Sequence, residues 1–126
     1  MDFKNIVIAS AANDCTVYAA EELKKYVRKV SGVNLEITDV KPSEGCFFSL
    51  GRTAAVSDGD YGKMISALNG DGYYISAKDG NIFLAAKTDR GLIYAAYEYI
   101  ERFLGVRFLT AEEEFVPSGR KIVLPT

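Results

Sequence analysis

Histidine is absent from the 126-residue sequence, and its absence limits the chemistry that the chain can perform. A Ser/His/Asp triad, a Cys/His nucleophile pair, a zinc site with imidazole ligands and c-type haem attachment all require this side chain. The groups that remain include 17 Asp and Glu, 15 Lys and Arg, and 8 Tyr. Any chemistry would therefore use carboxylates, tyrosines, lysines or a bound cofactor.

Three consecutive carboxylates, Glu112, Glu113 and Glu114, stand near the end of the sequence. Hydrolysis of a glycosidic bond needs two carboxyl groups that converge from different elements, one of them with a raised pKa. Neighbouring acids in a loop point apart, so this run is predicted to be a solvated surface. The segment 70–72 (Gly-Asp-Gly) lacks the third glycine of a dinucleotide-binding fingerprint, and no phosphate-binding P-loop motif occurs. The sequence therefore predicts no catalytic residue, no cofactor and no metal site.

Thr88-Asp89-Arg90-Gly91 lies between a predicted strand and a predicted helix. A polar loop at the carboxyl end of a strand is a common position for a ligand or partner contact. Helix capping by Thr88 or Asp89 is the favoured interpretation, because the preference for Thr and Asp at the N-cap explains both residue types. Capping does not require an arginine, so Arg90 remains a candidate contact for a carboxylate, with Asp89 beside it.

Aromatic residues occur in pairs on two predicted strands, Phe47-Phe48 and Tyr73-Tyr74. Such pairs stack on bases in RNA-recognition domains, but those domains also need a basic surface. The formal net charge of −2 and the sequence pI near 5.2 argue against nucleic acid as a partner and favour core packing. If the chain instead binds carbohydrate, the candidates for stacking on sugar rings are Tyr73, Tyr74, Tyr94 and Tyr99.

Length and composition indicate a single domain over residues 1–126 with an ordinary globular core. The unbroken apolar runs fall far short of the roughly 20 residues that cross a bilayer, and the start Met1-Asp2-Phe3-Lys4 does not resemble a signal peptide. We expect no membrane segment, and either a cytoplasmic chain or an exported protein whose signal has been removed. Cys15 and Cys46 lack Cys-x-x-Cys spacing and are expected to be buried free thiols, which leaves the compartment open.

Periodicity predicts two helices, over residues 14–31 and 89–104, each ended by a glycine, Gly32 and Gly105. The first is expected to start at an Asp14 cap and to bury a stripe that includes Val17, Leu23 and Val27. A weaker helical pattern surrounds Met64. Strands are predicted over 5–10, 33–38, 46–50, 73–77, 82–86, 106–109 and 121–124, and Asp79-Gly80 predicts a hairpin.

Two segments of the sequence, residues 6–37 and 82–109, share the order strand, helix, strand. Each is interpreted as a right-handed βαβ crossover, which places both helices on one face of a shared mixed sheet. The strands over 5–10, 46–50 and 82–86 are apolar at nearly every position, which is typical of strands covered on both faces. We therefore expect the second face to be covered by residues 52–70 or by something outside this chain.

The run from Thr88 to Leu109 resembles the second half of a known domain; its central part reads Ile93-Tyr94-Ala95-Ala96-Tyr97-Glu98-Tyr99-Ile100. That domain is the non-catalytic domain, domain 2-like, that precedes the (β/α)8 barrel of β-N-acetylhexosaminidases and α-glucuronidases. Shorter pieces occur in the same order as in that domain: Ala19-Ala20-Glu21-Glu22-Leu23, Val30-Ser31-Gly32, Leu50-Gly51, Gly72-Tyr73, Pro117, and Ile122 to Pro125. The resemblance covers essentially the whole chain.

This resemblance implies an α+β fold, in which two helices pack on one face of a mixed sheet in a zincin-like arrangement without a metal centre. It also implies a non-catalytic accessory domain of a glycoside hydrolase, whose partner is a C-terminal catalytic barrel of the same parent protein, absent here. The alternatives are a stand-alone module that binds glycan or protein and a ferredoxin-like regulatory or RNA-binding domain. An independent enzyme has the least support.

Overall fold

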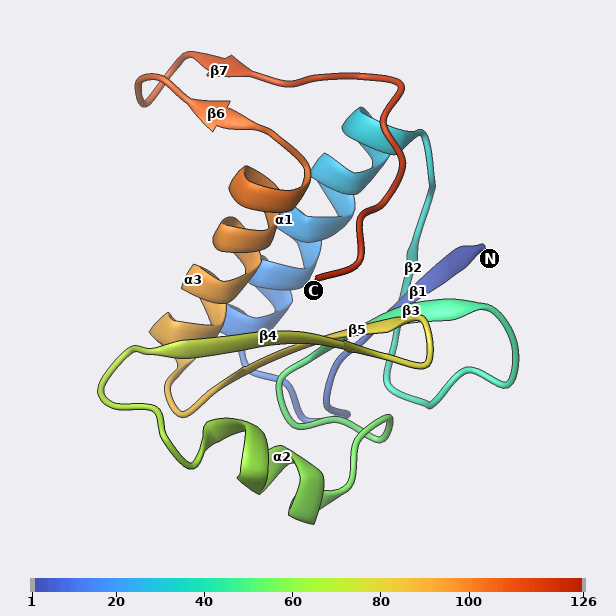
Figure 1. The fold of residues 1–126 in the computed structure, drawn as a ribbon, viewed down its shortest axis with the longest axis vertical. Helices are drawn as coiled ribbons and strands as arrows, with labels where there is room; N and C mark the ends of the chain where they lie inside the picture. The colour runs from blue at the N-terminus through green and yellow to red at the C-terminus, as the bar shows by residue number, and fades with distance from the viewer. Residues whose placement is uncertain (1, 126) are drawn as a thin grey trace.

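A five-stranded mixed sheet forms the middle layer of the computed structural model, which describes residues 2–125 (Figure 1). The strand order is β2-β1-β3-β5-β4. Neighbours from β2 to β5 pair in parallel, and β4 pairs antiparallel with β5 at one edge. The ferredoxin-like alternative, which has a four-stranded sheet, is therefore wrong. The strands are β1 (Phe3–Val7), β2 (Glu36–Thr38), β3 (Cys46–Leu50), β4 (Tyr73–Lys78) and β5 (Asn81–Ala86).

Helices α1 (Asp14–Ser31) and α3 (Asp89–Glu98) cover one face of the sheet, as predicted (Figure 1). The N-cap of α1 is Asn13, not Asp14: the Asn13 Oδ1 accepts a hydrogen bond from the Thr16 N–H at 2.9 Å. Gly32 ends α1 with φ of 80°, a left-handed conformation that costs glycine least. Val17 was expected on the buried stripe but is 39% exposed, because the stripe that faces the sheet starts at Ala19.

The second helix does not continue as one α-helix to residue 104. After α3 the chain widens into a π-helical turn, η1 (Tyr99–Phe103), in which the Leu104 N–H bonds to the Tyr99 carbonyl at 3.2 Å. Gly105 then ends the helical segment with φ of 81°, as the sequence predicts. Among the described residues, none of the helices has the combined length and hydropathy that spanning a membrane requires.

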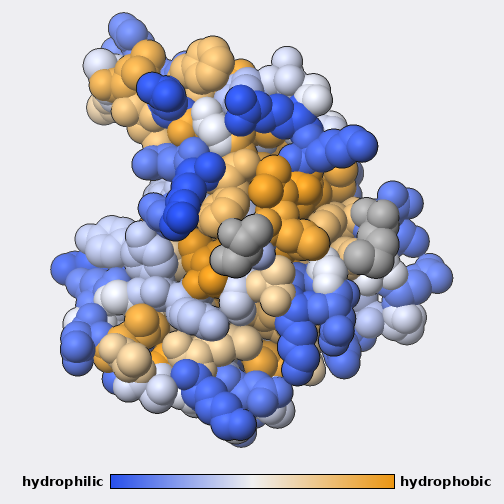
Figure 2. Space-filling view, in the orientation of Figure 1, coloured by the Kyte–Doolittle hydropathy of each residue, from blue (hydrophilic) through white to orange (hydrophobic). Residues whose placement is uncertain are grey.

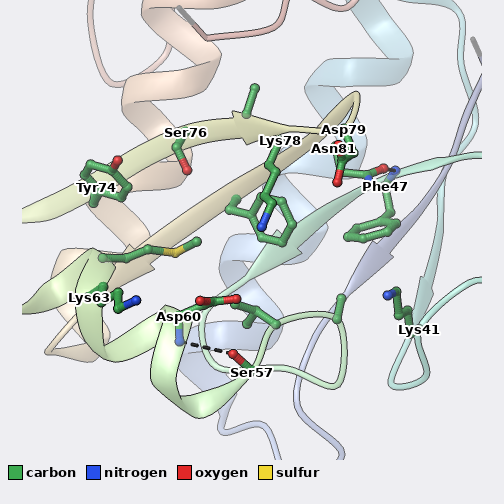
Figure 3. Close-up of a pocket in the computed structure, with 15 residues that line it drawn as sticks. Lys41, Phe47, Ser57, Asp60, Lys63, Tyr74, Ser76, Lys78, Asp79 and Asn81 are labelled. Atoms are coloured by element: carbon green, nitrogen blue, oxygen red, sulfur yellow. Dashed lines mark hydrogen bonds between the residues drawn. The ribbon is translucent and has the colours of Figure 1, made fainter.

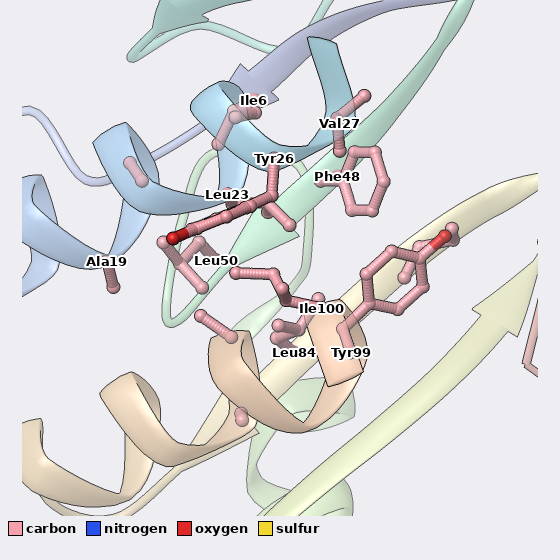
Figure 4. Close-up of a cluster of buried hydrophobic side chains, with 14 of the residues drawn as sticks. Ile6, Ala19, Leu23, Tyr26, Val27, Phe48, Leu50, Leu84, Tyr99 and Ile100 are labelled. Atoms are coloured by element: carbon pink, nitrogen blue, oxygen red, sulfur yellow. The ribbon is translucent and has the colours of Figure 1, made fainter. Parts of the chain in front are cut away.

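The main core lies between the sheet and the layer formed by α1, α3 and η1 (Figure 4). The Phe48 ring meets the Tyr99 ring edge to face at a centroid distance of 5.2 Å. Complete burial of one side chain of Leu or Ile size contributes about 1.5–3 kcal/mol, so this layer provides most of the stability. The fully buried members include Ile6, Leu23, Val27, Phe48, Leu50, Leu84, Tyr99 and Ile100.

Helix α2 (Asp58–Ile65) lies on the opposite face of the sheet (Figure 1). Its N-cap is Ser57, whose Oγ accepts from the Asp60 N–H at 3.1 Å. Val7, Phe47 and Phe83 form a small second core there, against which Met64 packs. The prediction that residues 52–70 cover this face is correct in part, because an open groove remains beside the helix.

The last two predicted strands differ from the structure. Residues 106–109 contribute only β6 (Arg107–Phe108), which pairs antiparallel with β7 (Glu114–Phe115) in a separate two-stranded sheet. The prediction of a second βαβ crossover over residues 82–109 is therefore wrong, because β6 does not join the five-stranded sheet. Residues 121–124 form no strand, since side chains rather than a neighbouring strand anchor this segment: the Tyr99 hydroxyl donates to the Val123 carbonyl at 2.7 Å.

The two cysteines occupy different environments. Cys46 is buried at the beginning of β3, as expected. Cys15 lies in the first turn of α1 and is exposed, so the expectation of burial is wrong for this residue. The two sulfurs are not joined in a disulfide.

Candidate functional site

Thr88 and Asp71 organise the junction between β5 and α3. The Thr88 Oγ1 accepts from the Gly91 N–H at 2.9 Å and donates to the Asp71 Oδ1 at 2.7 Å, so Thr88 is the N-cap. The Arg90 Nη1 lies 3.5 Å from the Asp71 Oδ2, with the arginine side chain 69% exposed. Arg90 therefore binds a carboxylate of its own chain, in an exposed pair that contributes at most about 1 kcal/mol.

Gly91 allows the loop before β4 to cross close to α3. A Cβ at this position would lie 3.0 Å from the Ala86 Cβ and from the carbonyl oxygens of Asp71 and Gly72. Backbone atoms cannot withdraw from such a contact as a flexible side chain can. The residue type is therefore set by close packing and gives no sign of a ligand.

A cavity of about 230 Å³ lies at the carboxyl ends of β1, β3 and β5, where α1 and α3 begin. Asp89 lines it, together with Lys87 and Arg52. Both cations have partners within the chain, because the Lys87 Nζ donates to the Leu68 carbonyl at 2.8 Å and the Arg52 Nη1 lies 2.7 Å from the Asp58 Oδ1. The cavity is small, and its two cations are already paired.

Tyr73 and Tyr74 point to opposite faces of β4, because successive side chains alternate along a strand. Tyr73 is half-buried against the main core; burial raises the pKa of its phenol, and the nearby Glu98 carboxylate adds to the increase. Tyr74 is 44% exposed on the α2 side. Adjacent positions thus give one ring to the core and one to solvent.

Tyr94 and Tyr99 also differ in their exposure to solvent. Tyr94 is 47% exposed on the outer side of α3. Tyr99 is 0% exposed, stacked on Phe103 at a centroid distance of 5.3 Å, so its ring is not available to a sugar. The six predicted contact residues do not converge on one site.

A groove of about 610 Å³, which the sequence patterns did not indicate, lies between α2 and the β4–β5 hairpin (Figure 3). Phe47, Phe83 and Met64 form its apolar part. Tyr74, Ser76 and Lys78 line it from β4, as alternate positions on one face of a strand. The alternation of side chains along β4 could have shown that Tyr74, Ser76 and Lys78 share one face of the strand. Only the fold shows that α2 lies opposite this face. The remaining lining residues are Lys41, Ala55, Val56, Ser57, Asp60, Lys63, Ala77, Asp79 and Asn81.

A second exposed surface, here called the helix-layer surface, lies on the outer side of α1 and α3 and on the β6–β7 hairpin. The Tyr97 and Tyr18 hydroxyl oxygens are 2.8 Å apart, and the Tyr97 hydroxyl donates to the Glu22 Oε1 at 2.9 Å. Burial and these hydrogen bonds raise the pKa of Tyr97 well above its usual range. The surface consists of Tyr18, Tyr94, Tyr97, Phe108, Leu109 and Phe115.

The three glutamates of the acidic run are all exposed, as predicted. Glu114 also has partners within the chain: it accepts a 2.6 Å hydrogen bond from the Tyr26 hydroxyl and lies 3.3 Å from the Lys29 Nζ. The Tyr26 hydrogen bond and the Lys29 ammonium hold the pKa of Glu114 below its usual value. Within residues 2–125, no three His, Cys, Asp or Glu side chains gather closely enough to hold a metal ion.

Comparison with known proteins gives the family. Residues 2–99 match the family model described as the N-terminus of glycosyl hydrolase family 67. The chain belongs to this family. The resemblance inferred from the sequence is therefore confirmed, and the chain is a non-catalytic, N-terminal accessory domain of the glycoside hydrolase type.

Two fungal proteins are similar to this family 67 N-terminal domain. An alpha-glucuronidase of Hypocrea jecorina is 29% identical over 107 residues, which are 79% of this chain. A probable alpha-glucuronidase A of Aspergillus fumigatus (strain CBS 144.89 / FGSC A1163 / CEA10) is 24% identical over 98 residues, or 76% of this chain. The matched region spans 12% of the length of each relative.

Two solved structures share the fold of this domain at 16% identity. The GH20 β-N-acetylhexosaminidase of Streptomyces coelicolor A3(2) matches with a TM-score of 0.55, over 96% of this chain and 20% of that one. A GH138 enzyme that targets pectin rhamnogalacturonan II matches with a TM-score of 0.53, over 80% of this chain and 13% of that one. The α+β arrangement of helices on a mixed sheet is thus shared with larger glycoside hydrolases.

Proposed function

We propose that residues 1–126 form one accessory domain of a glycoside hydrolase, which packs on and supports a catalytic (β/α)8 barrel located C-terminal to it in the parent protein. Family membership and the small share of the relatives that the domain matches support this proposal. The domain itself contributes binding energy and rigidity, and the barrel contributes the catalytic carboxylates.

The observation that carries the docking part is the helix-layer surface. Leu109 is 62% exposed and Phe115 is 54% exposed. Figure 2 shows apolar side chains at the β6–β7 hairpin and around the C-terminal segment, where Val123 and Leu124 are exposed. Exposed apolar side chains that gather on one surface are typical of interaction sites, whereas single exposed apolar residues are common on any protein.

The β6–β7 hairpin gives a second reason to propose that a partner docks on the helix-layer surface. Phe108 and Glu114 are cross-strand partners that contact Tyr26, which leaves Leu109 and Phe115 on the outward side. A two-stranded hairpin is marginally stable by itself. Apolar side chains on its outer side do not stabilise it while they are exposed to water. A partner that covers this side would stabilise the hairpin and remove the exposed apolar area.

The test compares the isolated domain with the parent protein that contains the barrel. The double substitution Leu109→Ser and Phe115→Ser is expected to lower the melting temperature of the parent and to speed proteolytic separation of its domains. The melting temperature of the isolated domain should change little, because both side chains are exposed. Val40→Ser is the matched control, since Val40 is 60% exposed in the loop after β2. Equal effects of the double variant and the control on the parent would refute docking through this surface.

We propose also that the fold is a zincin-like arrangement without a metal centre. The mixed sheet with one antiparallel edge strand and the absence of histidine support this relationship. Zinc should therefore leave the melting temperature unchanged, and stoichiometric zinc binding would contradict the proposal.

Carbohydrate binding is a second candidate function. The exposed ring of Tyr74 beside the groove is the observation that favours it, whereas the burial of Tyr99 removes one of the rings predicted for this role. Titration with oligosaccharides tests this function.

A further inference from the structure

The groove between α2 and the β4–β5 hairpin has the size and lining of a small-molecule site. Its volume of about 610 Å³ lies within the roughly 300–1,000 Å³ range typical of ligand pockets. It lies on the opposite side of the sheet from α1 and α3, so the helix-layer surface and the groove are separate. A ligand could occupy the groove while the other face is covered by a partner domain.

The apolar part of the groove is closely packed. Phe47 and Phe83 meet edge to face at a centroid distance of 5.9 Å and are almost fully buried, with Met64 packed against them. Tyr74 lies at one end with an exposed ring (Figure 3). An exposed aromatic ring beside a groove offers a flat apolar face to the C–H groups of a sugar ring, and the phenol hydroxyl is an additional hydrogen-bonding group.

Asn81 provides a positioned polar group in the same groove. Its Oδ1 accepts a 3.0 Å hydrogen bond from the Phe47 N–H, which fixes the orientation of the amide. Asn81 lines the groove, the Nδ2 of the same amide is a hydrogen-bond donor, and the Ser76 hydroxyl lies on the neighbouring strand. Planar amides and hydroxyls are suited to the hydroxyl groups of a saccharide.

Three lysines surround the opening, and they come from different elements. Lys41 follows β2, Lys63 belongs to α2 and Lys78 ends β4 (Figure 3). In the part of the chain that the structure describes, these three lysines form none of the six ion pairs, although Lys4, Lys25 and Lys29 do. Two carboxylates, Asp60 and Asp79, also line the groove and leave it with a net positive charge. Three cations around one opening raise the local concentration of an anion.

We propose that this groove binds an acidic oligosaccharide. One sugar ring stacks on Tyr74, the Asn81 amide donates to a hydroxyl, and Lys63 and Lys78 contact a carboxylate of the ligand. A neutral saccharide would leave the lysines without a partner, and an acidic peptide would not need the flat aromatic face. The proposal rests on the carbohydrate binding proposed above, for which it names the site and the ligand class, and it does not depend on docking on a catalytic domain.

The test uses isothermal titration of the 126-residue protein with three probes: an oligogalacturonate, a neutral xylo-oligosaccharide of equal length, and an oligoglutamate peptide. The oligogalacturonate is expected to bind saturably and more weakly as salt is added, and the neutral sugar to bind at least about tenfold more weakly. Lys63→Met with Lys78→Met should weaken binding by about tenfold or more, since the change removes both charges but keeps the apolar stems. Tyr74→Ala should also weaken it.

Lys24→Met with Lys121→Met is the matched control, because these lysines do not line the groove, and it should leave the affinity unchanged. Unchanged melting temperatures show that each variant is folded. No binding of the oligogalacturonate, equal binding of the neutral sugar, preferential binding of the peptide, or equal losses in the control would each overturn the proposal. None of these outcomes bears on the helix-layer surface, so the failure of one proposal is distinguishable from the failure of the other.

Discussion

Replacement of Tyr61 by phenylalanine tests how α2 is attached to the sheet. The Tyr61 hydroxyl donates to the Ala86 carbonyl at 3.0 Å and accepts from the Ala86 N–H at 3.1 Å. Parallel pairing between β3 and β5 ends at Leu50 and Leu84, two residues before Ala86. The phenol oxygen therefore supplies both hydrogen bonds at a position that β3 no longer reaches.

The expected cost follows from burial at this position. Tyr61 and Ala86 are both buried, and phenylalanine has no hydroxyl to replace the two hydrogen bonds. Two lost hydrogen bonds contribute about 0.5–1.5 kcal/mol each, and a buried donor without a partner costs about 1–3 kcal/mol. The Tyr61→Phe variant should lose about 2–4 kcal/mol of unfolding free energy, and its melting temperature should fall by roughly 8–16 °C for a domain of this size. The ring contact with the Arg52 guanidinium, 4.7 Å from the ring centroid, is retained.

Chemical denaturation and thermal melting followed by circular dichroism measure this loss, and hydrogen exchange of the Ala86 amide locates it. Tyr74→Phe is the matched control: its ring is exposed, and we expect a change of at most about 0.5 kcal/mol. Faster exchange at Ala86 without global unfolding is expected in Tyr61→Phe only. If both variants changed the unfolding free energy equally, the assignment of the Tyr61 hydroxyl to the end of the sheet would be refuted.

Two further predictions concern α3 and the β6–β7 hairpin. Gly91→Ala should lower the unfolding free energy by about 1–3 kcal/mol in spite of the better helix propensity of alanine, because of the 3.0 Å contacts with Asp71 and Gly72. In α2, Gly62→Ala has open space around the new Cβ and should stabilise by about 0.5–1 kcal/mol; stabilisation by both substitutions would contradict the packing argument. The lowered pKa of Glu114 stabilises the hairpin above the unfolded-state pKa of the carboxyl, and this stability is lost as the pH falls through its folded-state pKa. The NMR shifts of the Phe108 ring, which packs on Tyr26, should therefore move toward disordered values in acid, whereas Glu114→Gln should show little change over the same pH range.

Local signals were sufficient for the elements whose stability is decided within one segment. The apolar period over residues 14–31 and the glycine at 32 predicted α1, and Asp79-Gly80 predicted the β4–β5 turn, where both residues have positive φ. A cap at Thr88 or Asp89 was correctly predicted, because capping depends on residues three positions apart, and the structure shows that the cap is Thr88. The family was indicated by a resemblance, carried by the residues from Thr88 to Leu109 and by shorter pieces in the same order.

Elements that depend on distant partners were not predictable in this way. The apolar residues 121–124 looked like a strand, but the hydroxyl of Tyr99 anchors them instead of a neighbouring strand. Glu114 looked like one of three equivalent acids until Tyr26 was placed beside it, 88 residues earlier in the sequence. In each case a local pattern was consistent with several partners, and the tertiary contact selected one.

The amino-acid sequence by itself determined that imidazole chemistry is impossible here, that two amphipathic helices and a hairpin form, and that the chain resembles an accessory domain. Tertiary structure alone decided which tyrosines are exposed, and it created both the helix-layer surface and the groove. The physical reason is that side-chain periodicity specifies which face of an element is apolar, whereas the identity of the covering layer depends on contacts between distant segments. Tyr74 illustrates the difference: its sequence position gives the face of β4, and only the packing of α2 across the sheet makes that face the wall of a groove.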